Sequence, residues 1–225
     1  MKRTMFAVIP VLTLFLITTA VAEGSDYLPI NFDGKKVYKL TDDYRIQILR
    51  YFDPSAPSAV YHSDLRIDGV VVESVAMNLS NDSDGNIYCH GGCWTPFQAT
   101  CSLDPPELLI MTPLVVGNTW ESTCNSSAHG PMTFTSQVLR FEKITVPAGV
   151  FECYVIERCI TTFVWSYTSY EWYSEGVGIV KFSWPWVGTF ELLPGTDVLG
   201  PQRNQAKSGE EEDTDTWGGV KALYK

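Results

Sequence analysis

The central part of the chain alternates short apolar runs with polar breaks. From residue 24 to residue 200, runs rich in Val, Ile, Thr, Tyr, Phe and Trp are separated by Gly, Pro, Asn and Asp. This pattern is typical of β-strands joined by turns, and no stretch of it keeps a helical period over three turns. We therefore expect an all-β fold of antiparallel strands.

The expected strands are the apolar runs that turn signals bound on both sides. They are 36–40, 44–51, 70–79, 87–89, 108–112, 119–124, 134–146, 150–162, 164–173, 177–186 and 190–193. The clearest hairpin joins 134–146 to 150–162 through Pro147-Ala148-Gly149. Proline suits the first corner of a type I turn, and glycine suits the left-handed position that closes a three-residue loop.

The segment 150–162 is partly apolar on both faces. The residues of one face are Phe151, Cys153, Val155, Glu157 and Cys159, and those of the other are Glu152, Tyr154, Ile156, Arg158 and Ile160. A sheet with one fully wet face would alternate more sharply. We therefore predict a single antiparallel, strongly curved sheet, in the form of a half-open barrel or a sandwich.

The first residues have the order of a secretory signal. Lys2 and Arg3 precede an uncharged stretch that ends in Ala20-Val21-Ala22, a small-x-small cleavage pattern. The apolar stretch has only about 15 residues, fewer than the ~20 that a membrane-spanning helix needs. We predict a signal peptide over 1–22, export to the periplasm or the extracellular space, and no transmembrane anchor after cleavage.

The last residues differ in composition from the β domain, which we place at 23–200. Residues 201–225 begin as an acidic linker that contains Glu210, Glu211, Glu212, Asp213 and Asp215. Trp217, Val220, Leu223 and Tyr224 then follow at the spacing of a short amphipathic helix. This helix either docks on its own domain or is recognised by a sorting partner.

The net charge of the chain argues against one class of partner. The charge is −10, and loss of Lys2 and Arg3 with the signal peptide makes it −12 (−10 − 2). Non-specific nucleic-acid binding needs Lys and Arg against the phosphates. We therefore expect no nucleic-acid partner and no attraction to anionic membrane surfaces.

Six cysteines in an exported chain predict three disulfides. The cysteines are Cys89, Cys93, Cys101, Cys124, Cys153 and Cys159. If 151–162 is one strand, Cys153 and Cys159 lie about 20 Å apart, beyond the ~7 Å that a disulfide allows between Cα atoms. The other pairings stay open, with one local bridge expected among the first three cysteines.

Aromatic residues gather in the last quarter of the β domain. They are Trp165, Tyr167, Tyr170, Trp172, Tyr173, Phe182, Trp184 and Trp186. On a curved sheet such rings stack on a sugar or enclose an acyl chain, or else they only fill the core and the sheet rim. As candidate ligand-binding residues we take Trp165, Tyr167, Trp172 and Trp184.

Motifs for catalysis or cofactor binding are missing from the sequence. It contains no His-Glu-x-x-His, no Gly-x-Ser-x-Gly and no phosphate-binding glycine loop. Zinc binding by the segment 89–93 with Cys101 and His129 competes with disulfide formation, which an oxidising compartment favours. The segment 80–91 resembles a calcium loop only in part, because Ser80 and Gly91 replace the acids at its ends. We predict no catalytic residue, no metal and no cofactor.

Three segments resemble exported bacterial proteins of unknown function, some of which are called TapB-like. The segments are Val146-Pro147-Ala148-Gly149-Val150-Phe151-Glu152-Cys153, Trp172-Tyr173-Ser174-Glu175-Gly176-Val177-Gly178-Ile179-Val180-Lys181 and Pro113-Leu114-Val115-Val116-Gly117-Asn118-Thr119-Trp120. The resemblance covers roughly 27–195 and implies a strongly curved sheet or half-open barrel, similar to periplasmic lipoprotein carriers. It implies no catalytic residue, and the cysteine-rich stretch from Cys89 to Cys101 departs from the family's pattern.

Three functional hypotheses follow. The first is a non-enzymatic exported binding or carrier protein for an apolar or amphipathic ligand. The second is a structural or assembly factor of the cell envelope that acts through protein contacts. The third is a hydrolase, which would need acids or histidines gathered in one cleft. Paired acids such as Glu152 and Glu157 suit a glycosidase, but nothing in the sequence places two acids in one pocket.

Overall fold

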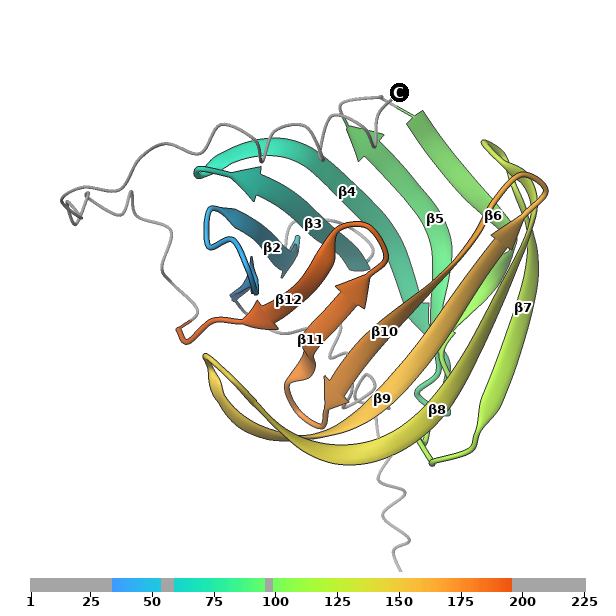
Figure 1. Cartoon of the computed structure of the whole chain (residues 1–225). Coiled ribbons are helices and arrows are strands. Elements are labelled where there is room, and N and C mark those ends of the chain that lie inside the picture. The colour runs from blue at the N-terminus through green and yellow to red at the C-terminus, as the bar shows by residue number, and fades with distance from the viewer. Residues whose placement is uncertain (1–33, 54–58, 96–98, 196–225) are drawn as a thin grey trace, which may run out of the picture.

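The computed structural model describes residues 34–53, 59–95 and 99–195, whose strands form one closed antiparallel barrel (Figure 1). The strands are β1 (Lys35–Leu40), β2 (Ile46–Phe52), β3 (Ala59–Ile67), β4 (Val70–Asn81), β5 (Ile87–Thr95), β6 (Ala99–Ile110), β7 (Thr119–Ser126), β8 (Gly130–Val146), β9 (Gly149–Thr162), β10 (Ser166–Ser174), β11 (Gly178–Trp184) and β12 (Gly188–Leu192). Each strand pairs with its neighbours in the chain. The predicted all-β, curved antiparallel sheet is confirmed, and it closes fully.

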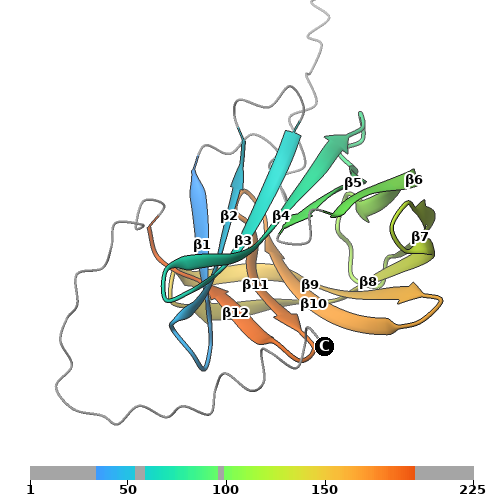
Figure 2. The ribbon, with the colours of Figure 1, turned by 90° about the horizontal axis from the view of Figure 1, so that it is seen from above.

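Closure comes from the pairing of the first strand with the last. Tyr38 lies opposite Leu192, and Leu40 lies opposite Phe190. This pairing satisfies the backbone groups of two strands that would otherwise be open edges. Figure 2 shows from above that β3 and β4 cross over β9 and β10, which form the opposite wall.

The strand prediction holds for most of the barrel. The expected hairpin around 147–149 is β8–β9, which is in register from Met132↔Thr162 to Val146↔Gly149. Gly149 has a φ of 142°, a value that glycine accepts at low cost. β3 was not predicted from the sequence, and within the cysteine-rich stretch Cys89 and Cys93 lie on β5 and Cys101 lies on β6.

Both faces of β9 are covered, as its composition predicted. Val155 and Cys153 on one face, and Ile156 on the other, are buried. A register shift between Val138 and Arg140 bends the partner strand β8 at this point. The bend helps the sheet to curve, so that one face of β9 lines the inside of the barrel.

The contact between β6 and β7 is the most sparsely paired seam of the barrel. Only two residue pairs are in register there, Leu103↔Ser126 and Asp104↔Asn125. The next two residues of β6 are prolines, which have no N–H to donate. Side chains bridge the gap instead: Ser122 Oγ accepts from the Leu108 N–H at 2.9 Å, and Trp120 Nε1 donates to the Leu108 carbonyl at 3.0 Å.

Two predicted segments lie outside the described residues. They are the signal peptide over 1–22 and the acidic linker with its short helix over 201–225. Within 34–53, 59–95 and 99–195, the structure has no helix that is long and apolar enough to cross a membrane.

The close approach of β4 and β5 at Gly92 gives a test of the packing. An added Cβ there would clash with the carbonyl oxygen of Ala76. We expect Gly92→Ala to lower the free energy of unfolding by about 2–3 kcal/mol, because backbone atoms must shift. Gly69→Ala is the control, since its Cβ would meet nothing within 4 Å and only its φ of +80° is unfavourable. Urea titrations of both variants measure the loss in the free energy of unfolding. Equal losses in the two variants would contradict a tight contact at Gly92.

Candidate functional site

The inner wall of the barrel carries charged side chains among apolar ones. Arg50 on β2 is only 5% exposed, Glu107 on β6 is 2% exposed, and Arg158 on β9 is also buried. Glu171 on β10 faces them, since its carboxylate interacts electrostatically with both arginines. These residues come from four strands around the barrel, so closure of the sheet is what brings them together.

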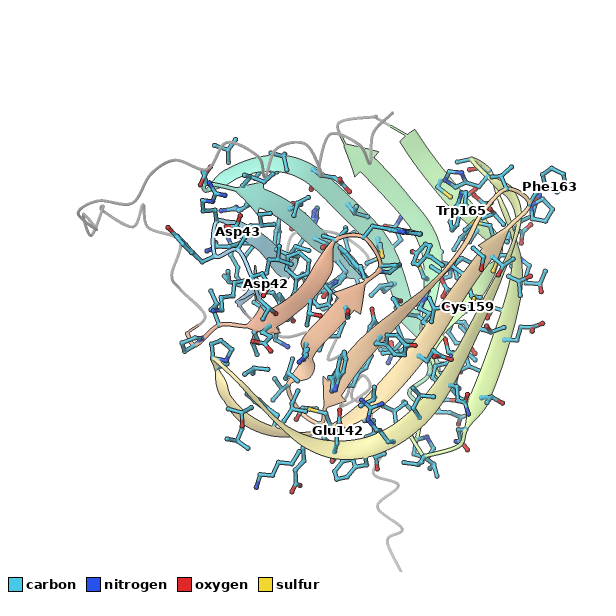
Figure 3. The ribbon with its side chains drawn as sticks, viewed as in Figure 1. Asp42, Asp43, Glu142, Cys159, Phe163 and Trp165 are labelled. Atoms are coloured by element: carbon cyan, nitrogen blue, oxygen red, sulfur yellow. The ribbon has the colours of Figure 1, made fainter. Side chains whose placement is uncertain are left out.

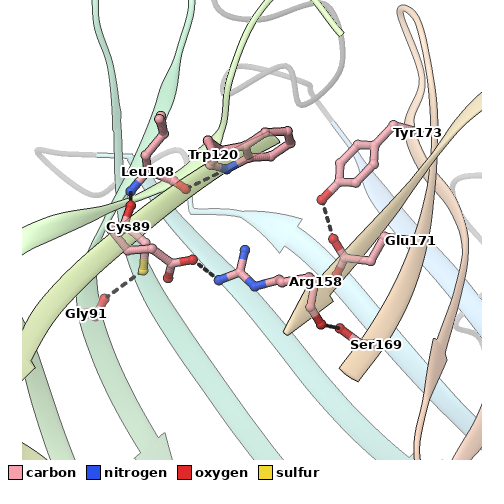
Figure 4. Close-up of polar contacts among 10 residues, drawn as sticks. Cys89, Gly91, Leu108, Trp120, Arg158, Ser169, Glu171 and Tyr173 are labelled. Atoms are coloured by element: carbon pink, nitrogen blue, oxygen red, sulfur yellow. Dashed lines mark hydrogen bonds and ion pairs between the residues drawn. The ribbon is translucent and has the colours of Figure 1, made fainter. Parts of the chain in front are cut away.

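Arg158 and Glu107 form a buried ion pair across the interior (Figure 4). Burial raises the pKa of the Glu107 carboxyl, while the Arg158 guanidinium opposes that rise. The ring centroid of Phe134 lies 5.4 Å from Arg158 Cζ, which adds a cation–π contact. The charge of Arg158 is therefore matched by a carboxylate inside the barrel.

Arg50 lies among aromatic rings, and the Glu171 carboxylate interacts with it electrostatically without forming an ion pair. Its Cζ lies 4.1 Å from the ring centroid of Phe182, 5.4 Å from that of Tyr38 and 5.9 Å from that of Trp184. Tyr61 shares a hydrogen bond with it. Arg50 forms no ion pair with any described residue, and its buried Nε has no hydrogen-bond partner.

Tyrosines complete the polar part of the interior. Tyr173 donates to Glu171 Oε2 at 2.5 Å, and Tyr38 donates to the Ile179 carbonyl at 2.7 Å. Burial raises the pKa of Tyr38, Tyr61 and Tyr173 above the ordinary value. These phenols therefore stay protonated at neutral pH and act as hydrogen-bond donors.

Lys36 adds a second cation beside Arg50. The two residues are directly opposite each other on β1 and β2. Burial first, and the charge of Arg50 second, lower the pKa of Lys36 to about 8. Its ammonium donates to the carbonyl oxygen of Val177.

The four aromatic residues proposed from the sequence do not share one surface. Trp184 lies inside, against Phe182 at 5.0 Å between ring centroids. Trp165 and Tyr167 stack on each other at 5.5 Å near the β9–β10 turn. Trp172 is on the outer face, because it alternates with Glu171; its Nε1 donates to Glu142 Oε1 at 2.7 Å.

An exposed aromatic surface lies at one end of the barrel, where three hairpin turns meet. We call it the aromatic rim; its exposed residues are His129, Phe163, Trp165 and Trp186, and the half-buried Tyr167 contacts Trp165 and Trp186. Phe163 is 94% exposed and Trp186 is 75% exposed, and Figure 3 shows Phe163 and Trp165 at the tip of the β9–β10 hairpin. Trp186 has a φ of 69°, which is costly for a bulky residue.

The six cysteines are free thiols in the structure, so the predicted three disulfides are not formed in it. Of the three possible local bridges, Cys93–Cys101 is disfavoured by the register, because Cys93 lies opposite Thr100 and Cys101 therefore faces the other side of the sheet. Cys153 and Cys159 both lie on β9, as expected. Burial raises the pKa of Cys89 and of Cys153 to about 11, so both stay protonated at neutral pH.

The segments considered for metal binding have other contacts. His90 Nε2 is 2.8 Å from Ser80 Oγ on the neighbouring strand. Asp82 Oδ1 accepts from the backbone N–H of Asp84 at 2.9 Å and of Asn86 at 3.0 Å, so it stabilises its own turn. No group of three or more His, Cys, Asp or Glu that could hold a metal occurs among the described residues.

Sequence reasoning missed the interior charges, although a signal for them was present. Arg158 occupies a position in step with Ile156 and Ile160, and Arg50 lies between Ile48 and Phe52 in the same way. A charged residue at an apolar position of a strand indicates a buried and partnered charge. The strand pattern does not indicate which residue is the partner of each buried arginine.

Removal of one partner of the buried ion pair gives a stability test. We expect Glu107→Ala to lower the free energy of unfolding by about 3–5 kcal/mol, because Arg158 is left buried without a counter-charge. The double variant Glu107→Leu/Arg158→Met should recover most of the loss. Asp43→Ala, in the exposed pair with Arg45, should change stability little. Chemical denaturation measures the free energy of unfolding of all three variants. A loss in the double variant equal to the sum of the losses from the two single substitutions would contradict the pairing.

Comparison with known families gives one partial match. A family model described as DUF3108-like matches residues 124–183, from β7 into β11. This segment contains Val146–Cys153 and Trp172–Lys181, two of the three segments on which the TapB-like resemblance depends. That resemblance itself stays a prediction. No curated protein sequence matches the chain.

Three solved structures are similar to the chain at low identity. A Bacteroides fragilis protein described as exported and as having a YmcC-like fold is 16% identical, with a TM-score of 0.43 over 73% of this chain and 96% of that one. A protein of Parabacteroides distasonis described as a lipoprotein is 12% identical, with a TM-score of 0.37 over 72% and 94%. The hypothetical lipoprotein YmcC of Escherichia coli is 10% identical, with a TM-score of 0.37 over 74% and 87%.

Proposed function

We propose that the protein is an exported, non-enzymatic binding or carrier protein that holds an amphipathic small molecule inside its barrel. The observation that carries this proposal is the mixed inner wall, where aromatic rings such as Phe182 and Trp184 lie beside Arg50. A barrel of twelve strands is also wider than the eight-stranded barrels whose interiors side chains fill.

The two kinds of wall residue suit the two ends of such a ligand. Phe182, Phe190 and Trp184 stack or tilt against one another, and Trp184, which is only partly buried, offers apolar surface to a chain or ring. The charged and phenolic groups beside them offer hydrogen bonds to a polar end. Hydrogen bonds are stronger in such a low-dielectric interior than in water.

The arrangement of acids supports binding rather than hydrolysis. Glu107 is paired with Arg158, and Glu171 accepts from Tyr173. Glu152 and Glu157 point to opposite faces of β9, since they are an odd number of residues apart. Export rests on the signal pattern over 1–22.

Mass spectrometry tests the carrier function directly. Protein purified from an oxidising compartment should have a native mass above its denatured mass by roughly a few hundred daltons, the mass of a small ligand. Trp184→Ala should lose most of this extra mass because it removes inner wall, whereas Trp172→Ala on the outer face should keep it. The proposal would be overturned if the native mass of the wild type equalled its denatured mass and the protein took up no added lipid.

A second candidate is an envelope structural or assembly factor that acts through protein contacts. The aromatic rim favours it, because a soluble domain rarely exposes several large rings together. The segment 159–170, which includes the β9–β10 turn, also has no charged residue. A protein partner would cover these rings and gain binding energy from their burial.

Photocrosslinking separates this candidate from the first. A benzophenone side chain in place of Phe163 should crosslink to one envelope protein in the cell, since Phe163 is at the tip of the rim. The same group in place of Phe141, which is half exposed on β8 away from the rim, should not give that product. Equal products from both positions, or none from Phe163, would count against a partner at the rim.

A further inference from the structure

Two cationic side chains lie side by side on the first two strands of the barrel. Lys36 and Arg50 are directly opposite each other on β1 and β2, a position in which like charges repel. Arg50 is buried, and an arginine keeps its charge inside a protein. Arg50 therefore places a permanent positive charge on this part of the inner wall, beside the side chain of Lys36.

The two interior arginines differ in how their charge is matched. Arg158 has a carboxylate partner in Glu107. Arg50 interacts electrostatically with the Glu171 carboxylate but forms no ion pair among the described residues, and the N–H at its Nε has no acceptor. A buried donor without an acceptor costs free energy, and an anion that enters the barrel would supply both the acceptor and the counter-charge.

The groups around Arg50 define the chemistry of that anion. Its guanidinium lies over Phe182, so one side of the site is an aromatic surface. Tyr61 places a phenol beside it, and Lys36 an ammonium. A headgroup bound here would meet charged donors, and the rest of the molecule would meet the partly buried Trp184.

We propose that Arg50, together with Lys36 and Tyr61, binds the carboxylate of an amphipathic ligand whose apolar chain lies along Trp184. The guanidinium fork matches a carboxylate in geometry. A single-charge carboxylate also loses less hydration energy than a doubly charged phosphate on entering an aromatic interior. This inference rests on the proposed function and adds the class of ligand.

Matched ligands test the role of Arg50. The probes are parinaric acid, a fluorescent long-chain carboxylate, the alcohol with the same chain, and an alkyl phosphate. The wild type should bind the acid roughly ten- to a hundredfold more tightly than the alcohol, the range expected for hydrogen bonds to a charged group. Arg50→Met should bind acid and alcohol alike, and Arg140→Met on the outer surface should behave as the wild type. Tighter binding of the alkyl phosphate would overturn the choice of carboxylate.

Thermal unfolding without ligand separates a binding role from a structural one. Arg50→Met should raise the melting temperature or leave it unchanged, because it removes a buried charge that has no direct ion pair. The acid should raise the melting temperature of the wild type but not that of Arg50→Met. A marked loss of stability in ligand-free Arg50→Met, with the preference for acid over alcohol retained, would assign Arg50 a structural role and overturn the inference.

The outcomes also separate this inference from the proposed function. If the wild type binds acid and alcohol equally well, and Arg50→Met does the same, the carrier function stands and the carboxylate site is wrong. If the wild type binds none of the three probes and has a bare native mass, the carrier function fails, and the inference fails with it.

Discussion

Closure of the sheet by β1 and β12 is the constraint on which the rest of the structure depends. Open edges would leave two strands with unpaired backbone groups, and the inner face would be a wet concave surface. Once Tyr38 pairs with Leu192, residues from both ends of the described chain share one interior. Arg50 reaches Phe182 only because of this closure, since they lie on strands on either side of the β1–β12 pair.

The closed interior requires that every charged group inside it be compensated. A charge in an apolar interior costs free energy unless hydrogen bonds or a counter-charge compensate it. Arg158 and Glu107 satisfy this requirement, and so does Glu171 with Tyr173. Arg50 satisfies it only in part, through Tyr61 and aromatic rings. Incomplete compensation of this kind is typical of sites that bind ligands, where stability is reduced for the sake of function.

The predictions from sequence were best where local pattern decides structure. The turn at Pro147-Ala148-Gly149 and the arms around it follow from turn chemistry and from strand propensity. The prediction missed β3, whose residues His62, Ser63 and Asp64 interrupt the apolar pattern. It also placed Trp172 and Trp184 in one candidate site, although alternation along β10 and β11 puts them on opposite faces of the sheet.

The sequence alone determined the all-β class, the main hairpins and the covered state of both faces of β9, because these depend on neighbouring residues and on a period of two. Only the tertiary structure decided that the sheet closes and which face is the interior. The pairing of Arg158 with a glutamate 51 positions away also depends on the complete barrel. The physical reason is that burial and electrostatic contact belong to the three-dimensional neighbourhood of a residue, which strand periodicity does not contain.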